Sequence, residues 1–234
     1  MKILFYTCTK LNKKAFVEYS PLYKSLVTEK AKEKSDNHFT GLRFGSELVV
    51  NFENTKSLSV QYNKARKYYD KFDAVVYIHD DVFITEGFLE SKLQMGFAEF
   101  DIVGLAGGAN PQLHKHGLWH LMCPKESMSG AVSHFTPDNR EFVTCFGPFG
   151  KRCILMDGLF LAVHTHTVKD KDLKWDENVM FHHYDLIFCL DANKKGLRMG
   201  TAPIYVVHES PGLKSFSEEY LQSEKYFIDY FNNY

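Results

Sequence analysis

Residues 72–84 have the sequence FDAVVYIHDDVFI, and this stretch decides the fold. The run from Ala74 to Ile78 is short, apolar and rich in β-branched and aromatic residues, which predicts a strand buried on both faces. It stops abruptly at His79, Asp80 and Asp81. Open α/β sheets bind ligands at the carboxyl ends of their strands. Because adjacent carboxylates repel each other unless they are neutralised, the pair indicates either a divalent metal site or a polar strand end with a helix cap.

The composition is that of a globular chain. Its 234 residues suit one domain, its 44% hydrophobic content suits a substantial core, and its net charge of −1 creates no overall basic field for nucleic acid or anionic membrane. The five cysteines are dispersed without a CxxC pair, which favours reduced thiols in a cytoplasmic protein. The N-terminal apolar run is too short for a signal peptide, and no apolar stretch approaches the roughly 18 residues that span a bilayer.

The hydrophobic pattern around the central stretch predicts alternating strands and helices, which is typical of a sheet between helices. Besides residues 74–78, we expect strands at 3–6, 47–52, 101–108 and 204–207, and helices at 15–34, 54–70, 86–97, 185–195 and 215–231. Pro21 should break or restart the first helix, and Gly196 should close the fourth. Ser215 and Glu218 suggest a capping box for the last helix.

Two other segments lack a clear period. Residues 37–45 are expected to be a loop. Residues 110–151 are rich in Gly, Pro, His and aromatic residues, and so long an irregular stretch in a compact domain indicates a functional loop region.

Polar or small residues follow several of the predicted strands, and the carboxyl ends of parallel strands share one edge of a sheet. These residues are Thr7, Thr9, Gly107, Gly108 and His208, in addition to the triplet at 79–81. Glycines would let a ligand approach the backbone. Two carboxylates and a distant histidine could meet around one ion, and that ligand set suits Mn²⁺ and leaves Mg²⁺ possible. Taken alone, His208 could equally be a packed or capping histidine.

Two later segments offer further chemistry. Asp157 and Gly158 interrupt the apolar run 154–163, either as a simple turn or as backbone that admits a substrate. Residues 181–185, FHHYD, could form a helix cap or could supply a general base for an attacking hydroxyl. A helix N-terminus would favour the ionised form of Asp185 and lower its pKa.

The order and spacing of these segments resemble a GT-A glycosyltransferase of the family-2-like kind, closest to the streptomycin-biosynthesis-protein-F-like glycosyltransferase domain, over nearly the whole chain. The triplet 79–81 corresponds to the DXD motif, with Asp81 at the metal-ligand position and His79 where many members have Asp. The segment ending in Asn63 is similar to the helix before that motif. Residues 156–163 resemble the acceptor-side strand, and residues 208–212 resemble the segment whose histidine completes the metal site.

The resemblance also implies roles for the remaining candidates. The catalytic base is expected within 175–190, where the family has a Glu-Asp pair. The candidates in order are Asp185, His183 and Glu177. The metal, Mn²⁺ or Mg²⁺, is assigned to Asp81 and His208. The donor pocket is assigned to Thr7, Thr9, Asn63, His79, Asp80, Gly107, Gly108, Asp157 and Gly158.

The resemblance implies one α/β domain over residues 1–234, a GT-A (Rossmann-like) fold with a mixed, mostly parallel sheet flanked by helices. Residues 1–108 would bind the nucleotide sugar, and residues 109–234 would bind the acceptor and carry catalysis. The implied reaction is metal-dependent transfer of a hexose or pentose from a nucleotide sugar, first of all a UDP-sugar, to an acceptor hydroxyl with inversion. The acceptor could be a saccharide, a lipid-linked glycan or a modified base in DNA. The alternatives are a nucleotidyltransferase acting on a sugar phosphate and a non-catalytic nucleotide-sugar-binding module.

Overall fold

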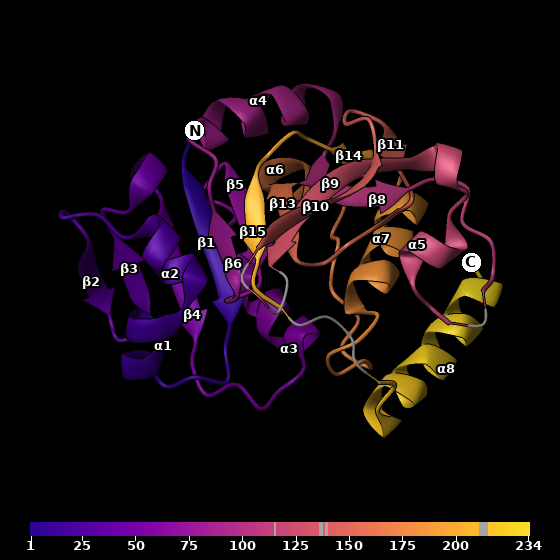
Figure 1. Ribbon diagram of the computed structural model, residues 1–234, viewed down its shortest axis with the longest axis horizontal. Coiled ribbons are helices and arrows are strands. Elements are labelled where there is room, and N and C mark those ends of the chain that lie inside the picture. The colour runs from indigo at the N-terminus through magenta and orange to yellow at the C-terminus, as the bar shows by residue number, and fades with distance from the viewer. Residues whose placement is uncertain (115, 136–137, 139, 211–214) are drawn as a thin grey trace.

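The computed structural model describes residues 1–114, 116–135, 138, 140–210 and 215–234. Within them, two mixed sheets are flanked by helices (Figure 1). The main sheet has nine strands in the order β11 (Arg152–Cys153), β14 (Met199–Thr201), β7 (Ile102–Gly104), β13 (Phe160–His164), β5 (Ala74–Ile78), β1 (Ile3–Cys8), β4 (Glu47–Asn51), β3 (His38–Thr40) and β2 (Lys32–Ser35). The predicted central strand is confirmed, because β5 is buried along its whole length.

The second sheet contains six strands among the described residues. Its order is β12 (Leu155–Met156), β8 (Ala106–Gly108), β9 (Met128–Phe135), β15 (Val206–His208) and β6 (Val82–Ile84), with β10 (Glu141–Gly147) paired to β9. The helices are α1 (Lys13–Tyr19), α2 (Pro21–Leu26), α3 (Leu58–Asn63), α4 (Leu89–Glu99), α5 (Trp119–Met122), α6 (Thr165–Asp170), α7 (Tyr184–Lys194) and α8 (Glu218–Asn232), with short 3₁₀ turns at Arg43–Gly45, Lys64–Tyr68 and Lys125–Ser127.

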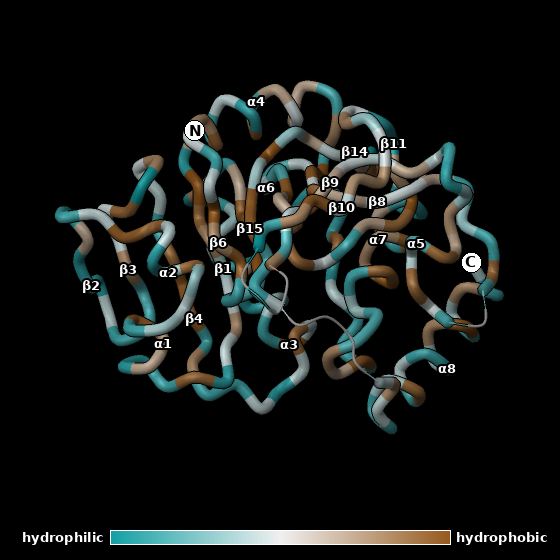
Figure 2. Tube along the Cα trace, in the orientation of Figure 1, coloured by the Kyte–Doolittle hydropathy of each residue, from teal (hydrophilic) through white to brown (hydrophobic). Residues whose placement is uncertain are grey.

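Strand β13 makes the centre of the main sheet mixed, because it is antiparallel to both of its neighbours. Strands β14, β7, β5, β1 and β4 all run in one direction, and β13 runs against them between β5 and β7. The expected mixed character is therefore confirmed, but the expectation of mostly parallel pairing is wrong. In the described part of the chain, three strand pairs of the main sheet are parallel and five are antiparallel, because β13 and the edge strands β11, β3 and β2 pair in the antiparallel sense. Hydrophobic residues concentrate in the central strands, whereas the edge strand β2 is hydrophilic and fully exposed (Figure 2). Charged residues on an exposed edge oppose pairing with another chain.

Several predicted elements are wrong in part. The helix expected at 15–34 ends at Leu26, and a hairpin of β2 and β3 occupies residues that were expected to be helix and loop. The expected strand 101–108 is two strands, β7 and β8, which lie in different sheets. Helix α8 is capped by Ser217, whose side chain accepts from the backbone N–H of Tyr220, instead of by Ser215.

The expected loop region at 110–151 is the largest error. It contains helix α5 and the antiparallel pair β9 and β10. Strand β10 is mostly exposed, so its sequence lacks the apolar alternation that marks a half-buried strand.

Gly130 in β9 shows why small residues are frequent in this region. Its φ is +100°, and a Cβ there would lie 1.9 Å from the backbone oxygen of Leu105. That oxygen accepts a hydrogen bond from the backbone N–H of Ala131 at 3.1 Å, so the backbone segments around Leu105 and Gly130 must approach closely. A side chain at this position would separate β9 from the crossing between β7 and β8.

We expect Gly130→Ala to lower the melting temperature by roughly 5–10 °C, because backbone strain and the clash together cost a few kcal/mol. Gly150→Ala is the matched control. Gly150 also has a positive φ, of +83°, but a Cβ there would have no atom within 4 Å. Differential scanning calorimetry of both variants separates the clash from the strain. Equal destabilisation by the two substitutions would show that the contact with Leu105 is unimportant.

Candidate active site

The site residues lie where the chain passes from one sheet to the other. Residues 79–81 connect β5 of the main sheet to β6 of the second sheet, and residues 157–159 connect β12 of the second sheet to β13 of the main sheet. At a crossing of this kind the backbone leaves one ladder before it enters the next. Polar side chains there can therefore face a cavity instead of the core.

Strand register brings these crossings together. Phe160 of β13 pairs with Ile78 of β5, and the backbone N–H of His79 donates to the oxygen of Leu159 at 3.1 Å. On the second sheet, His208 of β15 lies opposite Val82 of β6. The N–H of Glu209 also donates to the backbone oxygen of Asp81 at 2.9 Å. The triplet, Gly158 and His208 are thus neighbours, although they are far apart in sequence.

Three of these side chains form a candidate metal centre. One ligand atom each from His79, Asp81 and His208 lies within 4.8 Å of the others. Nε2 of His208 is 3.3 Å from Oδ1 of Asp81. Both atoms are buried, and apart from this contact with each other neither has a hydrogen-bond partner among the described residues. A buried imidazole nitrogen and a carboxylate oxygen that converge on one point fit a divalent cation.

The pKa values of Asp81 and His208 shift in the directions that favour a charged carboxylate beside a charged imidazole. Burial alone would raise the pKa of Asp81, but the adjacent His208 and His79 together outweigh it and lower that pKa below its ordinary value. Burial alone would lower the pKa of His208, but Asp81 raises it overall. His79 was assigned to the donor pocket, and the structure places it beside the two expected metal ligands.

The main base candidate, Asp185, lies at the start of α7 beside Gly158. Its Oδ2 accepts from the N–H of Gly158 at 2.8 Å, and its Oδ1 accepts from the N–H of Leu186 at 3.0 Å. Burial, and then the charge of Asp157, raise the pKa of Asp185 to about 7. The expectation of a lowered pKa is therefore wrong, because burial and a second carboxylate outweigh the helix N-terminus.

Glycine at position 158 makes this contact possible. A Cβ there would lie 2.6 Å from the hydroxyl of Tyr184 and 2.7 Å from Cβ of Asp185. The missing side chain admits these two residues of α7, and the assignment of Gly158 to the donor pocket stays a prediction. Asp157 accepts from Nε1 of Trp119 at 3.1 Å, which fixes its carboxylate near Asp185.

The other base candidates have structural partners. His183 is buried, its Nδ1 lies 3.0 Å from Oγ of Ser223, and its ring stacks on Phe227 of α8. Burial lowers the pKa of His183 to about 4. Glu177 accepts from Nδ2 of Asn63 at 2.8 Å. The catalytic roles of His183 and Glu177 stay predictions.

Asn63 also has a structural role. Its side chain exchanges two hydrogen bonds with the backbone of Trp175, one in each direction and both at 2.9 Å. Its amide therefore fastens the loop before α7 to the end of α3. The geometry gives no support for its assignment to the donor pocket.

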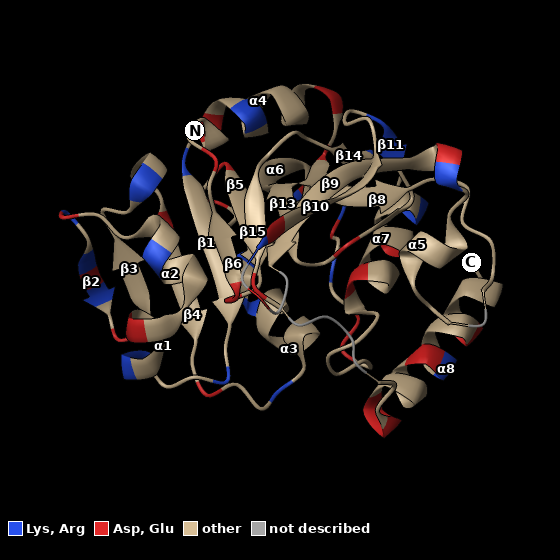
Figure 3. Cartoon of the chain, in the orientation of Figure 1, with Lys and Arg blue, Asp and Glu red and all other residues tan. Residues whose placement is uncertain are grey.

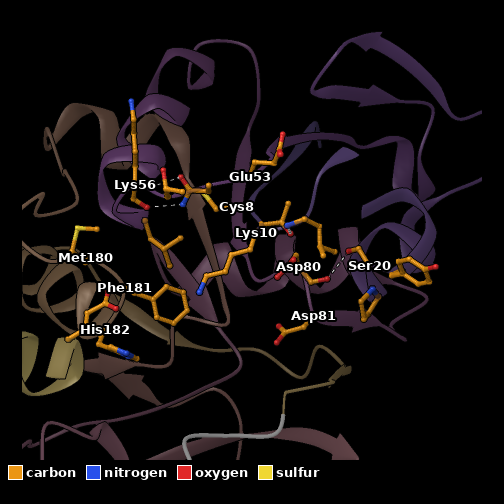
Figure 4. A pocket seen from close by; sticks show the side chains of 18 residues that line it. Cys8, Lys10, Ser20, Glu53, Lys56, Asp80, Asp81, Met180, Phe181 and His182 are labelled. Atoms are coloured by element: carbon orange, nitrogen blue, oxygen red, sulfur yellow. Dashed lines mark hydrogen bonds between the residues drawn. The ribbon is translucent and has the colours of Figure 1, made fainter. Parts of the chain in front are cut away.

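A cavity of about 1030 Å³ opens beside Asp81, one of the three candidate metal ligands (Figure 4). It is lined by the ends of β1 and β5, the junction of α1 and α2, residues 53–58 and residues 180–182. Thr9, Asp80 and Asp81 belong to its wall. The assignment of Thr9 and Asp80 to the donor pocket stays a prediction. Burial raises the pKa of Asp80, and a hydrogen bond with Thr9 opposes that shift.

Other expected pocket residues lie elsewhere. Thr7 is fully buried in β1, and its Oγ1 has no hydrogen-bond partner among the described residues. A Cβ at Gly107 would lie 2.5 Å from the oxygen of Leu155, and one at Gly108 would lie 2.6 Å from Cβ of Cys123. These glycines accommodate neighbouring parts of the chain, and their assignment to the donor pocket stays a prediction.

Sequence reasoning missed other residues of the cavity wall. Lys10 extends across the opening toward Phe181 (Figure 4). Its position directly after Thr9 at a strand end was the available signal. Ser20 caps α2 and donates from its Oγ to the backbone oxygen of Asp80 at 2.7 Å, which fixes the start of the crossing.

Comparisons with known proteins agree with this architecture. The profile of the Glycosyltransferase like family matches residues 39–230. The structure of Staphylococcus aureus TarS residues 1–349 matches with a TM-score of 0.52 and 15% identity, and its complex with UDP matches with 0.53 and 14%. Each match covers 97% of this chain and 64% of the TarS chain, so the protein spans less than two thirds of that structure.

No match to a curated protein was found. None of the helices in the described ranges has the length and apolarity that a membrane crossing requires. The structural likeness shows a shared GT-A fold, and the family profile covers most of the sequence. The chain therefore belongs to the Glycosyltransferase like family.

Proposed function

We propose that this protein transfers a sugar from a nucleoside diphosphate sugar, first of all a UDP-sugar, to an acceptor hydroxyl. One observation carries the proposal. The large cavity ends at Asp80 and Asp81, beside a buried carboxylate oxygen and imidazole nitrogen whose only polar contact among the described residues is with each other. A nucleotide in this cavity would place its diphosphate next to the candidate metal centre. The UDP complex of the TarS structure supports uridine as the first nucleotide to test.

The cavity wall suits the parts of such a donor. Lys10 offers a positive charge for phosphate oxygens, and Thr9 and Asp80 offer polar groups at the inner end. Phe181 and His182 offer aromatic surfaces near the opening. We assign the donor to these residues.

Asp81 and His208 would hold a divalent ion, Mn²⁺ or Mg²⁺, through Oδ1 and Nε2, the buried atoms that lie 3.3 Å apart. Such an ion neutralises charge that develops on a departing diphosphate. The chain's own part is to hold these ligands in place. Backbone hydrogen bonds to the oxygens of Asp80 and Asp81 do so from α2 and from the end of β15.

Asp185 would accept the proton of the attacking hydroxyl. A pKa of about 7 makes its carboxylate a stronger base than an exposed aspartate and still leaves it largely ionised slightly above neutrality. The N–H of Gly158 orients the carboxylate toward the crossing beside His79. A single displacement from this side would invert the anomeric carbon.

The two halves of the chain would contribute differently to donor binding and to catalysis. Residues 1–108 supply most of the donor cavity, and residues 109–234 supply Asp185 and the hairpin of β9 and β10 near the acceptor side. His208 comes from the second half but would serve the donor. Among acceptors we propose a saccharide hydroxyl. Figure 3 shows Lys and Arg interspersed with Asp and Glu on the visible face, and this pattern does not favour a DNA-bound acceptor.

The product separates the candidate reactions. With Mn²⁺ and UDP-, GDP- or CMP-sugars, we expect the protein to release a free nucleotide from one donor slowly by hydrolysis and faster with acceptor saccharides. For a UDP-sugar the product is UDP, measured by coupled assay or chromatography. Pyrophosphate production from a nucleoside triphosphate and a sugar phosphate would indicate a nucleotidyltransferase. Donor binding without any turnover would indicate a binding module.

A further inference from the structure

His79 occupies the first position of the triplet, where it has a geometry that the donor assignment does not explain. One of its ring nitrogens lies within 4.8 Å of the ligand atoms of Asp81 and His208. The rings of His79 and His208 have centroids 6.1 Å apart and planes inclined at 60°. Both imidazoles therefore border the same small space as the carboxylate.

Tyr184 is placed to set which ring nitrogen of His79 carries the proton. The Tyr184 hydroxyl lies 2.8 Å from Nε2 of His79 and donates to the backbone oxygen of Gly158 at 3.2 Å. A carbonyl oxygen only accepts, and a tyrosine has one hydroxyl hydrogen. When that hydrogen bonds Gly158, the hydroxyl can only accept from His79. The proton of the neutral imidazole is then on Nε2, and Nδ1 keeps its lone pair.

This arrangement is one that metal-binding histidines use. Such a histidine donates its second ring N–H to a fixed acceptor, which sets both the tautomer and the ring orientation. Tyr184 is a rigid acceptor, because it is buried and its ring packs against Tyr62 and Trp175 with centroids 5.8 and 5.7 Å away.

The geometry points to His79 as a third metal ligand through Nδ1, with Tyr184 as its positioning residue. The centre then has two imidazoles and one carboxylate. Mg²⁺ prefers oxygen ligands, whereas imidazole favours transition metals, so this centre should select Mn²⁺ over Mg²⁺. The inference deepens the proposed function, since it concerns the ion that would hold the donor diphosphate.

The metal alone tests the inference, without donor or acceptor. Titration of the full chain with Mn²⁺, followed by electron paramagnetic resonance, gives the affinity, and pulsed spectra report directly bound ¹⁴N nuclei. We expect two bound nitrogens in the wild type and one in His79→Gln. Tyr184→Phe should weaken Mn²⁺ binding by roughly 10- to 100-fold, the usual effect of losing such a partner. His79→Asp should lower the preference for Mn²⁺ over Mg²⁺.

Tyr69→Phe is the matched control, because it also removes a buried hydroxyl. That hydroxyl lies 2.7 Å from the hydroxyl of Tyr77 and does not belong to the candidate metal centre. It should leave Mn²⁺ affinity unchanged. Circular dichroism checks that each variant is folded, and His79→Gln carries the test if Tyr184→Phe does not fold. One bound nitrogen in the wild type, unchanged affinity in His79→Gln or no Mn²⁺ binding would overturn the inference. Intact Mn²⁺ binding without sugar transfer would overturn the proposed function alone.

Discussion

Asp185→Asn should reduce kcat by about 100-fold or more, because the amide cannot accept the proton of the attacking hydroxyl. The affinity for nucleotide should hardly change, since Asp185 lies outside the donor cavity, beside Gly158 and the start of α7. Steady-state kinetics with calorimetric nucleotide binding measure both quantities. If the variant melts at a lower temperature but its folded fraction turns over normally, Asp185 is only a helix cap. His183 and Glu177 would then become the base candidates.

The dependence of activity on pH is a second test of Asp185 as the catalytic base. Since burial and Asp157 raise the pKa of Asp185 to about 7, its basic form is lost as the pH falls through 7. Activity should therefore decline on the acid side with a midpoint near that pH. Asp157→Asn removes the second cause of the shift and should move the midpoint to lower pH. An unmoved acid limb would mean that another group controls it.

Asp81→Asn should weaken Mn²⁺-dependent nucleotide binding by at least about 100-fold, since losing even an outer partner of a metal ligand costs 10- to 100-fold. The amide keeps the shape of the side chain and loses its charge, so the fold should be retained. Calorimetry with UDP, with and without Mn²⁺, measures the effect.

Asp80→Asn is the neighbouring control for Asp81→Asn. Asp80 contacts Thr9 and lies outside the candidate metal centre. Asp80→Asn can weaken nucleotide binding, but the addition of Mn²⁺ should still strengthen the binding of nucleotide to this variant. If Asp81→Asn keeps the same Mn²⁺ enhancement as the wild type, Asp81 is not a metal ligand.

The sequence was most informative where one local rule decided the structure. A fully buried strand needs an uninterrupted apolar run, and residues 74–78 have one, so β5 and the polar triplet after it were predictable. Gly196 likewise follows α7 with a φ of +75°, as expected of a residue that closes a helix. The family and the GT-A fold followed from the order of such segments. The finer streptomycin-type resemblance stays a prediction.

The rest depended on contacts between distant segments. The raised pKa of Asp185 comes from burial and from Asp157, which lies on another crossing. The position of His79 beside His208 depends on the pairing of β15 with β6. Gly107 and Gly108 are small because β12 and Cys123 lie against them. None of these neighbours is visible from local sequence, so the residue types were recognised but their roles were not.

The reversed strand β13 also has a consequence for how the protein is made. Its two neighbours, β5 and β7, are both synthesised before it, and β13 pairs with them only after the long segment between β7 and β13 has emerged. Until then, two apolar strands in the middle of the main sheet have unpaired edges. Such edges recruit other chains, and pairings between distant segments form slowly. The nascent chain is therefore most prone to aggregation while translation proceeds from β7 to β13.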